Sequence, residues 1–210
     1  MKPYYEQDGI TIFHGDCREI LPSVDAAVML TDPPFGIGYR SGKEGPYKGT
    51  SIANDDSTDV RDEALKLWGT RPALVFGNWR HPVYHAKQAL VWDKGNGVGM
   101  GDLSIPWKPN WELIFVLGSG FQGKRTSGVL LDTSVVSWAS KGRQHPNMKP
   151  TGLLKKLLAK CPDGIVIDPF MGSGSTLIAA RDEGRQAIGI EISEEYCEKA
   201  VNRLRQKVLF

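Results

Sequence analysis

The sequence lacks the features that mark several specialised classes of protein. Among its 210 residues there are only three cysteines, Cys17, Cys161 and Cys197, an odd number with no C-x-x-C pair. We therefore expect neither a disulfide framework nor a structural zinc site. No stretch has the unbroken apolar length of a membrane span, and the amino terminus has no signal-peptide core. These absences predict a cytoplasmic protein, and the length fits one domain over residues 1–210.

The chain also lacks a large net charge, but its positive charge is unevenly placed. The formal net charge is +2, whereas residues 119–160 contain eight Lys or Arg and one acid. Such a basic stretch in an otherwise slightly acidic protein indicates a polyanion partner. Lys155, Lys156 and Lys160 fit a solvent-facing helix surface equally well. We expect the phosphates of such a partner to be contacted by the basic side chains of the preceding loop: Lys124, Arg125, Lys141 and Arg143.

Short apolar runs alternate with stretches of helical spacing along the chain. This alternation predicts an α/β fold, with one Rossmann-like, mostly parallel, seven-stranded sheet flanked by helices. The two strands near residues 89–117 need not be parallel to the others. The predicted strands are 11–13, 27–30, 73–76, 89–92, 113–117, 165–167 and 187–190, and the predicted helices are 16–21, 59–68, 151–161, 175–183 and 193–206. Ser193 is the expected N-cap of the last helix.

A four-residue motif, Asp32-Pro33-Pro34-Phe35, follows the apolar run 26–30. The run reads as a buried parallel strand, and ligands of open α/β sheets lie beyond the carboxyl ends of such strands. The motif combines a carboxylate that accepts hydrogen bonds, two residues without backbone donors and a ring that can stack. These groups suit an amino group on a flat heterocycle. A simple strand-ending turn explains the four residues about equally well.

A second motif combines a strand, an acid, a glycine-rich turn and a helix start. Asp168 ends the strand, Gly172 and Gly174 lie in the turn, and Glu191 ends the next strand. Glycines allow a ligand close to the backbone, free amides at the helix start hold an anionic group, and the distal acid suits ribose hydroxyls. Leu177 stands where a dinucleotide fingerprint would have its third glycine, and Asp168 would repel a pyrophosphate. We therefore predict S-adenosylmethionine as the cofactor.

Both motifs, in this order, resemble those of the DNA amino-methyltransferases, which methylate adenine N6 or cytosine N4. The resemblance is to the circularly permuted order, in which the catalytic motif precedes the cofactor motif, and it covers most of the chain outside two loops. The matching segments are 15–17, 32–35, 145–150, 168–176 and 189–191.

The resemblance implies a role for each matching residue. The catalytic residues would be Asp32, Pro33, Pro34 and Phe35. The acid Asp16 would bind the adenine of the cofactor, Glu191 its ribose, and the turn from Asp168 its methionine part. The full cofactor-binding set would be Asp16, Cys17, Lys149, Asp168, Pro169, Phe170, Gly172, Gly174, Ser175 and Glu191.

The implied activity is methylation of the N6 amine of a flipped adenine in DNA. Adenine is preferred because the family's cytosine enzymes usually begin the catalytic motif with Ser, whereas this chain has Asp32. The alternatives are an N4-cytosine DNA methyltransferase, a methyltransferase of proteins or small molecules, and a catalytically silent module that binds nucleic acid.

Two long polar segments have no clear secondary structure. Residues 36–58 follow the catalytic motif and are expected to form a lid, and residues 118–148 are expected to contact DNA and recognise its target. We expect both segments at the same edge of the sheet. Because the second is short for target recognition, the sequence is also compatible with a homodimer.

Overall fold

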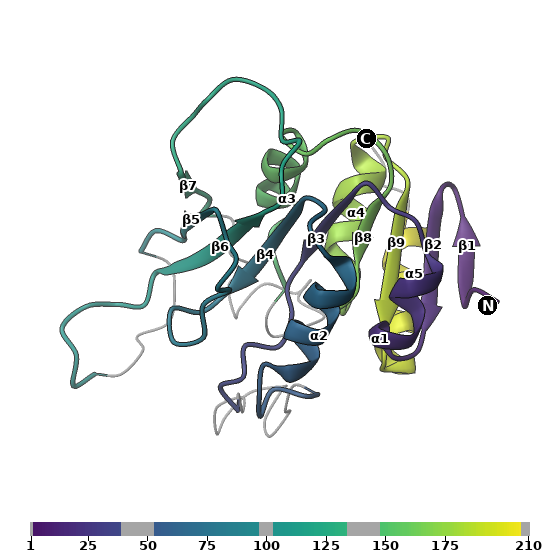
Figure 1. Cartoon of the computed structure of the whole chain (residues 1–210), viewed down its shortest axis with the longest axis horizontal. Helices are drawn as coiled ribbons and strands as arrows, with labels where there is room; N and C mark the ends of the chain where they lie inside the picture. The colour runs from purple at the N-terminus through teal and green to yellow at the C-terminus, as the bar shows by residue number, and fades with distance from the viewer. Residues whose placement is uncertain (1, 39–52, 97–102, 134–147, 207–210) are drawn as a thin grey trace.

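The computed structural model describes residues 2–38, 53–96, 103–133 and 148–206, and within these residues nine strands form one sheet (Figure 1). The expected number of seven is wrong. The two additional strands have three residues each and lie at the two edges of the sheet, and such short elements give no apolar period in the sequence. The strands are β1 (Tyr5–Gln7), β2 (Ile10–His14), β3 (Val28–Thr31), β4 (Ala73–Gly77), β5 (Gln88–Asp93), β6 (Trp111–Leu117), β7 (Val129–Leu131), β8 (Val166–Asp168) and β9 (Ala187–Glu191).

The helices lie close to their predicted positions. Helix α2 has the predicted bounds, and the others are shorter by a few residues at their ends, where helix assignment is least certain from sequence. The helices are α1 (Cys17–Ile20), α2 (Asp59–Trp68), α3 (Thr151–Leu158), α4 (Ser175–Asp182) and α5 (Glu194–Arg205), with a 3-10 turn η1 (Leu21–Ser23).

The sheet has the order β1-β2-β9-β8-β3-β4-β6-β5-β7. The strands from β2 to β4 in this order are parallel, whereas β6 runs antiparallel to β4 and to β5. The prediction of a mostly parallel α/β sheet is confirmed. Of the two strands that need not be parallel to the others, β6 runs against the central strands, whereas β5 has their direction because it is antiparallel to β6. One consequence concerns the site: the first residues of β6 lie beside the carboxyl end of β4, because Leu113 pairs with Gly77.

Helices cover the two faces of the sheet (Figure 1). Alternate residues of β3 point to opposite faces, so that Val28 and Leu30 belong to one apolar core and Met29 to the other. The first core includes buried residues of α3, α4 and α5, and the second includes buried residues of α1 and α2. Both cores fix β3 at the centre of the sheet, and with it the position of the residues that follow.

Strands from the two ends of the chain are neighbours in the sheet. Strand β9 pairs in parallel with β2, from Ile10 with Ala187 to His14 with Glu191. A further hydrogen bond of 2.9 Å joins the Gly15 amide to the Glu191 carbonyl oxygen. A circularly permuted chain begins and ends where the connection between two neighbouring strands has been cut. The pairing of β2 with β9 is therefore the arrangement expected for the permuted order.

The basic segment does not lie where we expected it. Strand β6 ends at Leu117 beside Ala73, the first residue of β4, so the loop that follows lies at the amino edge of the parallel strands. Residues 118–128 therefore lie at the opposite edge of the sheet from Asp32. Strand β7, which is parallel to β5, then returns the chain toward the edge where Asp32 lies. The expectation that both long segments share one edge is wrong for these residues, because the sequence did not give the direction of β6.

None of the described helices is long and apolar enough to span a membrane.

Candidate active site

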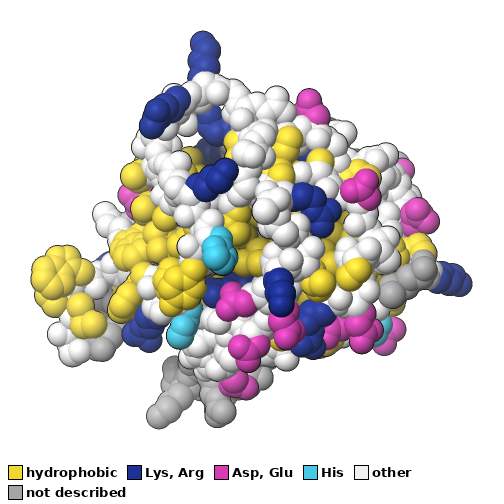
Figure 2. Space-filling model, viewed as in Figure 1, with side chains coloured by type: hydrophobic (Ala, Val, Ile, Leu, Met, Phe, Trp, Pro, Cys, Tyr) yellow, Lys and Arg dark blue, Asp and Glu magenta, His cyan; other side chains and the backbone are white. Residues whose placement is uncertain are grey.

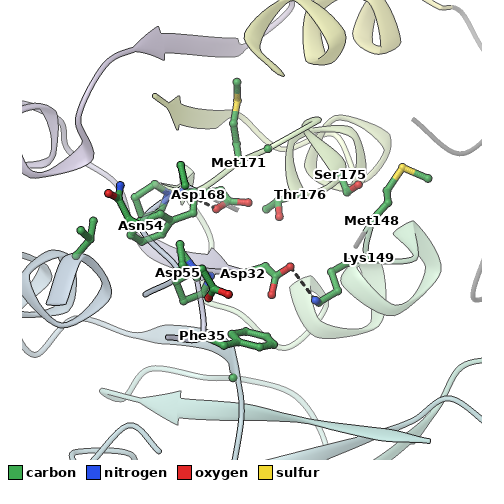
Figure 3. Close-up of a pocket in the computed structure, with 18 of the residues that line it drawn as sticks. Asp32, Phe35, Asn54, Asp55, Met148, Lys149, Asp168, Met171, Ser175 and Thr176 are labelled. Carbon is green, nitrogen blue, oxygen red and sulfur yellow. Dashed lines mark hydrogen bonds and ion pairs between the residues drawn. The ribbon is translucent and has the colours of Figure 1, made fainter. Parts of the chain in front are cut away.

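A cavity of about 720 Å³ lies at the carboxyl edge of the parallel strands. Its size is in the range of small-molecule and cofactor sites. The ends of β2, β3, β8 and β9 contribute Asp16, Asp32, Asp168 and Glu191, so the cavity contains both motifs predicted from the sequence (Figure 3). Of the predicted cofactor and catalytic residues, all line this cavity except Gly174: Asp16, Cys17, Asp32, Pro33, Pro34, Phe35, Lys149, Asp168, Pro169, Phe170, Gly172, Ser175 and Glu191.

The glycine-rich turn is held around the buried carboxylate of Asp168. Its Oδ1 accepts hydrogen bonds from the Thr31 hydroxyl at 2.7 Å and the Phe170 amide at 3.1 Å. Burial raises the pKa of Asp168 to about 6. Gly174 has φ of +80°, and a Cβ there would lie 3.0 Å from the Cβ of Ala200 on α5. Only glycine allows this turn to approach the helix so closely.

Glu191 joins the end of β9 to the same turn. Its Oε2 accepts a hydrogen bond from the Gly172 amide and its Oε1 one from the Ser193 amide, both at 2.9 Å. Burial raises its pKa despite these bonds. The side chain of Ser193, the predicted cap of α5, makes no capping bond, and its amide is instead bound by Glu191. The second acid of the predicted cofactor site is therefore fixed in the cavity wall.

Asp16 lies at the start of α1, whose first turn it caps. Its Oδ1 accepts from the Arg18 amide at 2.9 Å, and the Arg18 guanidinium contacts both the carboxylate of Asp16 and that of Glu63. The hydrogen bond from the Arg18 side chain lowers the pKa of Asp16. The neighbouring Cys17 is buried, and burial raises its thiol pKa to about 12, so it is not a nucleophile at neutral pH.

Asp32 follows β3 and is paired with a lysine. The Nζ of Lys149 lies 2.7 Å from Asp32 Oδ2 and 2.8 Å from Glu112 Oε1, and Lys94 lies 2.8 Å from Glu112 Oε2 (Figure 3 draws the first of these pairs). Asp32 Oδ1 has no hydrogen-bond partner among the described residues. Phe35 packs on the core beside the pair, with Lys149 Nζ 5.6 Å from its ring centre.

Neither Glu112 nor Lys94 was predicted to belong to the site. Glu112 is the second residue of β6, and Lys94 directly follows β5. Because β6 is antiparallel to β4, its first residues lie at the edge where the parallel strands end. The expected mixed direction of these strands was the signal that could have placed Glu112 in the site.

Asp55 ties together the ends of the predicted lid segment. Its Oδ1 accepts a hydrogen bond from the Gly36 amide at 2.9 Å, and its carbonyl oxygen accepts one from the Gly38 amide at 2.7 Å. Gly36 has φ of +70°, and a Cβ there would lie 2.9 Å from Thr58 Cγ2. Residues 39–52 of this segment lie outside the described part of the chain, whereas Ala53, Asn54 and Asp55 line the cavity.

We expect Asp55→Ala to lower the free energy of unfolding by roughly 1–3 kcal/mol, because the part-buried Gly36 amide loses the acceptor that the buried Asp55 side chain provides. Urea denaturation followed by circular dichroism measures this change. Asp56→Ala, at the adjacent exposed position, is the control and should leave stability unaltered. Equal stability of the two variants would contradict the role given to the Asp55 carboxylate.

The predicted DNA-contacting residues lie away from the cavity or outside the described residues. Lys124 and Arg125 belong to the loop at the amino edge, where Figure 2 shows basic side chains at the top of the view. Lys141 and Arg143 are outside the described residues. The helix lysines have intramolecular partners, since Lys155 pairs with Asp182, Lys156 with Asp132, and Lys160 donates to the Lys124 carbonyl.

Comparison with known proteins assigns the family. A family model described as DNA methylase matches residues 79–202, which is more than half of the chain. The chain belongs to this DNA methylase family. Type II methyltransferase M2.LlaDCHI of Lactococcus lactis subsp. cremoris is 30% identical over 98% of this chain and 93% of the relative. Type II methyltransferase M.ScaI of Streptomyces caespitosus is 27% identical over 97% and 84%.

Solved structures show the methyltransferase fold of this family member. The M1.HpyAVI–SAM complex aligns with a TM-score of 0.67 at 23% identity, over 94% of this chain and all of the other. PvuII DNA methyltransferase, named cytosine-N4-specific, aligns with a TM-score of 0.73 at 16% identity, over 100% and 91%. The predicted fold and the predicted family are both confirmed. The methyltransferase family uses S-adenosylmethionine, as predicted, and includes enzymes for adenine N6 and cytosine N4.

Proposed function

We propose that this DNA methylase transfers a methyl group from S-adenosylmethionine to the N6 amine of adenine in DNA. The observation that carries the proposal is the acceptor oxygen Asp32 Oδ1. It is shielded from solvent and has no hydrogen-bond partner among the described residues, yet it belongs to a side chain that lines the same cavity as the glycine-rich turn. A buried acceptor without a donor is costly, and an amine of the substrate would supply the donor.

The residues of the cavity fit the cofactor. Glu191 is a half-buried acid that would accept from the ribose hydroxyls, and Asp16 would accept from the adenine amine. A Cβ at Gly172 would meet no atom within 4 Å, so the turn faces open space there and leaves room for the methionine part. When bound, S-adenosylmethionine supplies an electrophilic sulfonium methyl group.

Asp32 and the Pro33-Pro34 pair would act on the target amine. The lone pair of an exocyclic amine is delocalised into the ring, which makes the nitrogen a poor nucleophile. Hydrogen bonds from its N–H groups to Asp32 Oδ1 and a proline carbonyl favour a pyramidal nitrogen with an available lone pair. Asp32 or water would accept, late in the reaction, the proton that the amine loses as it takes the methyl group from the sulfonium sulfur, which would keep the bonding electron pair. Phe35 stacks on the flipped base.

Aromatic side chains at the mouth of the cavity support a nucleic-acid substrate. Trp79 and Trp111 line the cavity and are 64% and 44% exposed. The nearby β5–β6 connection adds the exposed hydrophobic residues Leu103, Ile105 and Trp107. Figure 2 shows hydrophobic side chains gathered at the left of the view, the side on which this connection lies in Figure 1. Such side chains stack on bases or fill the space left by a flipped base. We therefore place the DNA at this edge of the sheet.

Adenine is preferred over cytosine on the resemblance of the catalytic motif, which begins with Asp32 rather than Ser. The N4-cytosine alternative is kept because the PvuII enzyme, whose name gives that specificity, has the same fold. A homodimer and a cytoplasmic location stay predictions.

Mass spectrometry of nucleosides tests the proposal. Unmodified DNA incubated with the protein and S-adenosylmethionine should gain N6-methyladenine. Appearance of N4-methylcytosine alone would support the alternative target. Absence of any methylated base, with cofactor binding intact by calorimetry, would favour a silent binding module and contradict the proposed activity.

A further inference from the structure

Four charged side chains form a row that ends at Asp32. Lys94 contacts Glu112, Glu112 contacts Lys149, and Lys149 contacts Asp32, at 2.8, 2.8 and 2.7 Å. They come from the end of β5, the start of β6, the residue before Pro150 and the end of β3. Their signs alternate, so the row is neutral as a whole and each charge has an opposite neighbour.

The row is held away from solvent. The side chains of Lys149 and Glu112 are 9% and 12% exposed, and the rings of Phe35 and Phe76 lie 5.6 and 4.9 Å from Lys149 Nζ. A pair of charges in such surroundings interacts strongly, and loss of one partner leaves the other uncompensated. The Lys149 ammonium therefore has a fixed position between the two carboxylates.

The contact leaves the two oxygens of Asp32 in different states. Oδ2 accepts from Lys149, whereas Oδ1 has no hydrogen-bond partner among the described residues and no contact with solvent. A carboxylate can accept through both oxygens, but a protonated carboxyl group donates through one of them. Because Lys149 donates to Oδ2, a proton on Asp32 would reside on Oδ1, so Asp32 can receive an N–H group at Oδ1 only while it is ionised and correctly turned.

We propose that Lys149 and Glu112 are positioning residues for methyl transfer: Lys149 holds Oδ2 of Asp32 and keeps the carboxylate ionised, and Glu112 holds Lys149. Oδ1 then stays vacant for the amine of the target base. The inference rests on the proposed function and adds two residues that act through Asp32. It differs from the sequence-based prediction for Lys149, which was contact with the cofactor.

The charges around Asp32 decide whether its pKa rises or falls when Lys149 or Glu112 is replaced. Burial raises the pKa of Asp32, the Lys149 charge opposes this rise, and the carboxylates of Glu112 and Asp168 add to it. Glu112 itself is largely shielded from solvent, which favours its neutral form, but the ion pairs with Lys149 and Lys94 bring its pKa below the usual value, so it stays charged. Loss of Lys149 should therefore favour protonated Asp32, and loss of the Glu112 charge should disfavour it.

The experiment measures single-turnover methylation rates against pH, with saturating S-adenosylmethionine, for the wild type, Lys149→Met, Lys149→Arg and Glu112→Gln. The rate rises with pH as Asp32 ionises. In Lys149→Met this rise should move to higher pH by about one unit or more, the effect of removing an adjacent opposite charge. In Glu112→Gln it should move to lower pH, and Lys149→Arg should restore most of the wild-type profile. Lys155→Met, which removes a charge on α3 that pairs with Asp182, is the control and should not move it.

Opposite shifts in the two variants would support the inference, because a purely structural role moves neither profile. If the wild type is active and the pH profiles of both variants are unshifted, the inference is overturned but the proposed function stands. An inactive wild type would contradict the proposed function itself. A raised KM for S-adenosylmethionine in Lys149→Met without a shift would assign Lys149 to the cofactor and also overturn it. If Lys149→Met fails to fold, the shift in Glu112→Gln decides.

Discussion

Asp32→Ala should lower the single-turnover rate of methyl transfer by about 10²–10³-fold, the usual loss when one preorganised electrostatic contact to the reacting group is removed. The carboxylate is the acceptor that reshapes the target amine, and its Oδ1 has no hydrogen-bond partner among the described residues. Binding of S-adenosylmethionine should be unaltered, because the acids that would hold it, Asp16 and Glu191, are separate. Quench-flow measurement on DNA and calorimetry of cofactor binding check the two halves of this expectation.

The stability of Asp32→Ala and one control variant separate chemistry from folding. Asp32→Ala leaves Lys149 paired with Glu112, so the lysine keeps a counter-ion and thermal unfolding should remain cooperative. Asp25→Ala removes an exposed carboxylate before the other end of β3 and should retain full activity. Wild-type turnover in Asp32→Ala would exclude Asp32 from the reaction.

Much of the fold was predictable because two signals in the sequence are local. Apolar runs such as 73–76 identify buried strands, and the spacing within 59–68 identifies a helix whose bounds the structure reproduces. The direction of β6 is different, since it depends on pairing between residues distant in sequence, such as Val75 with Phe115. The basic loop after β6 was placed at the wrong edge for this reason.

The same distinction applies to the site. Asp32, Asp168 and Glu191 each end a parallel strand, and the general position of ligands in α/β sheets was enough to bring them to one cavity. Glu112 starts an antiparallel strand, and no motif surrounds it. Its contact with Lys149 joins residues 37 positions apart, a distance that no sequence period reveals. Such a contact becomes visible only once the strand order is known.

Glu191→Ala should weaken the binding of S-adenosylmethionine by roughly ten- to a hundred-fold, since hydrogen bonds to a charged group contribute about 1.5–3 kcal/mol. The substitution removes the proposed ribose acceptor. It also frees the amides of Gly172 and Ser193, which Glu191 now binds at 2.9 Å, so the turn that faces the cofactor loses its link to β9. Isothermal titration calorimetry gives the dissociation constant.

Comparison of three variants separates the two effects of Glu191. Glu191→Gln keeps an oxygen for one of the two amides but loses the charge, so an intermediate affinity is expected if the carboxylate binds ribose. Glu195→Ala removes an exposed acid on α5 that pairs with Lys199, and it should bind the cofactor like the wild type. Saturating cofactor should restore the rate of Glu191→Ala, because Asp32 and its partners are intact. An unaltered dissociation constant in Glu191→Ala would confine Glu191 to bracing the turn and would leave the ribose without its proposed acceptor.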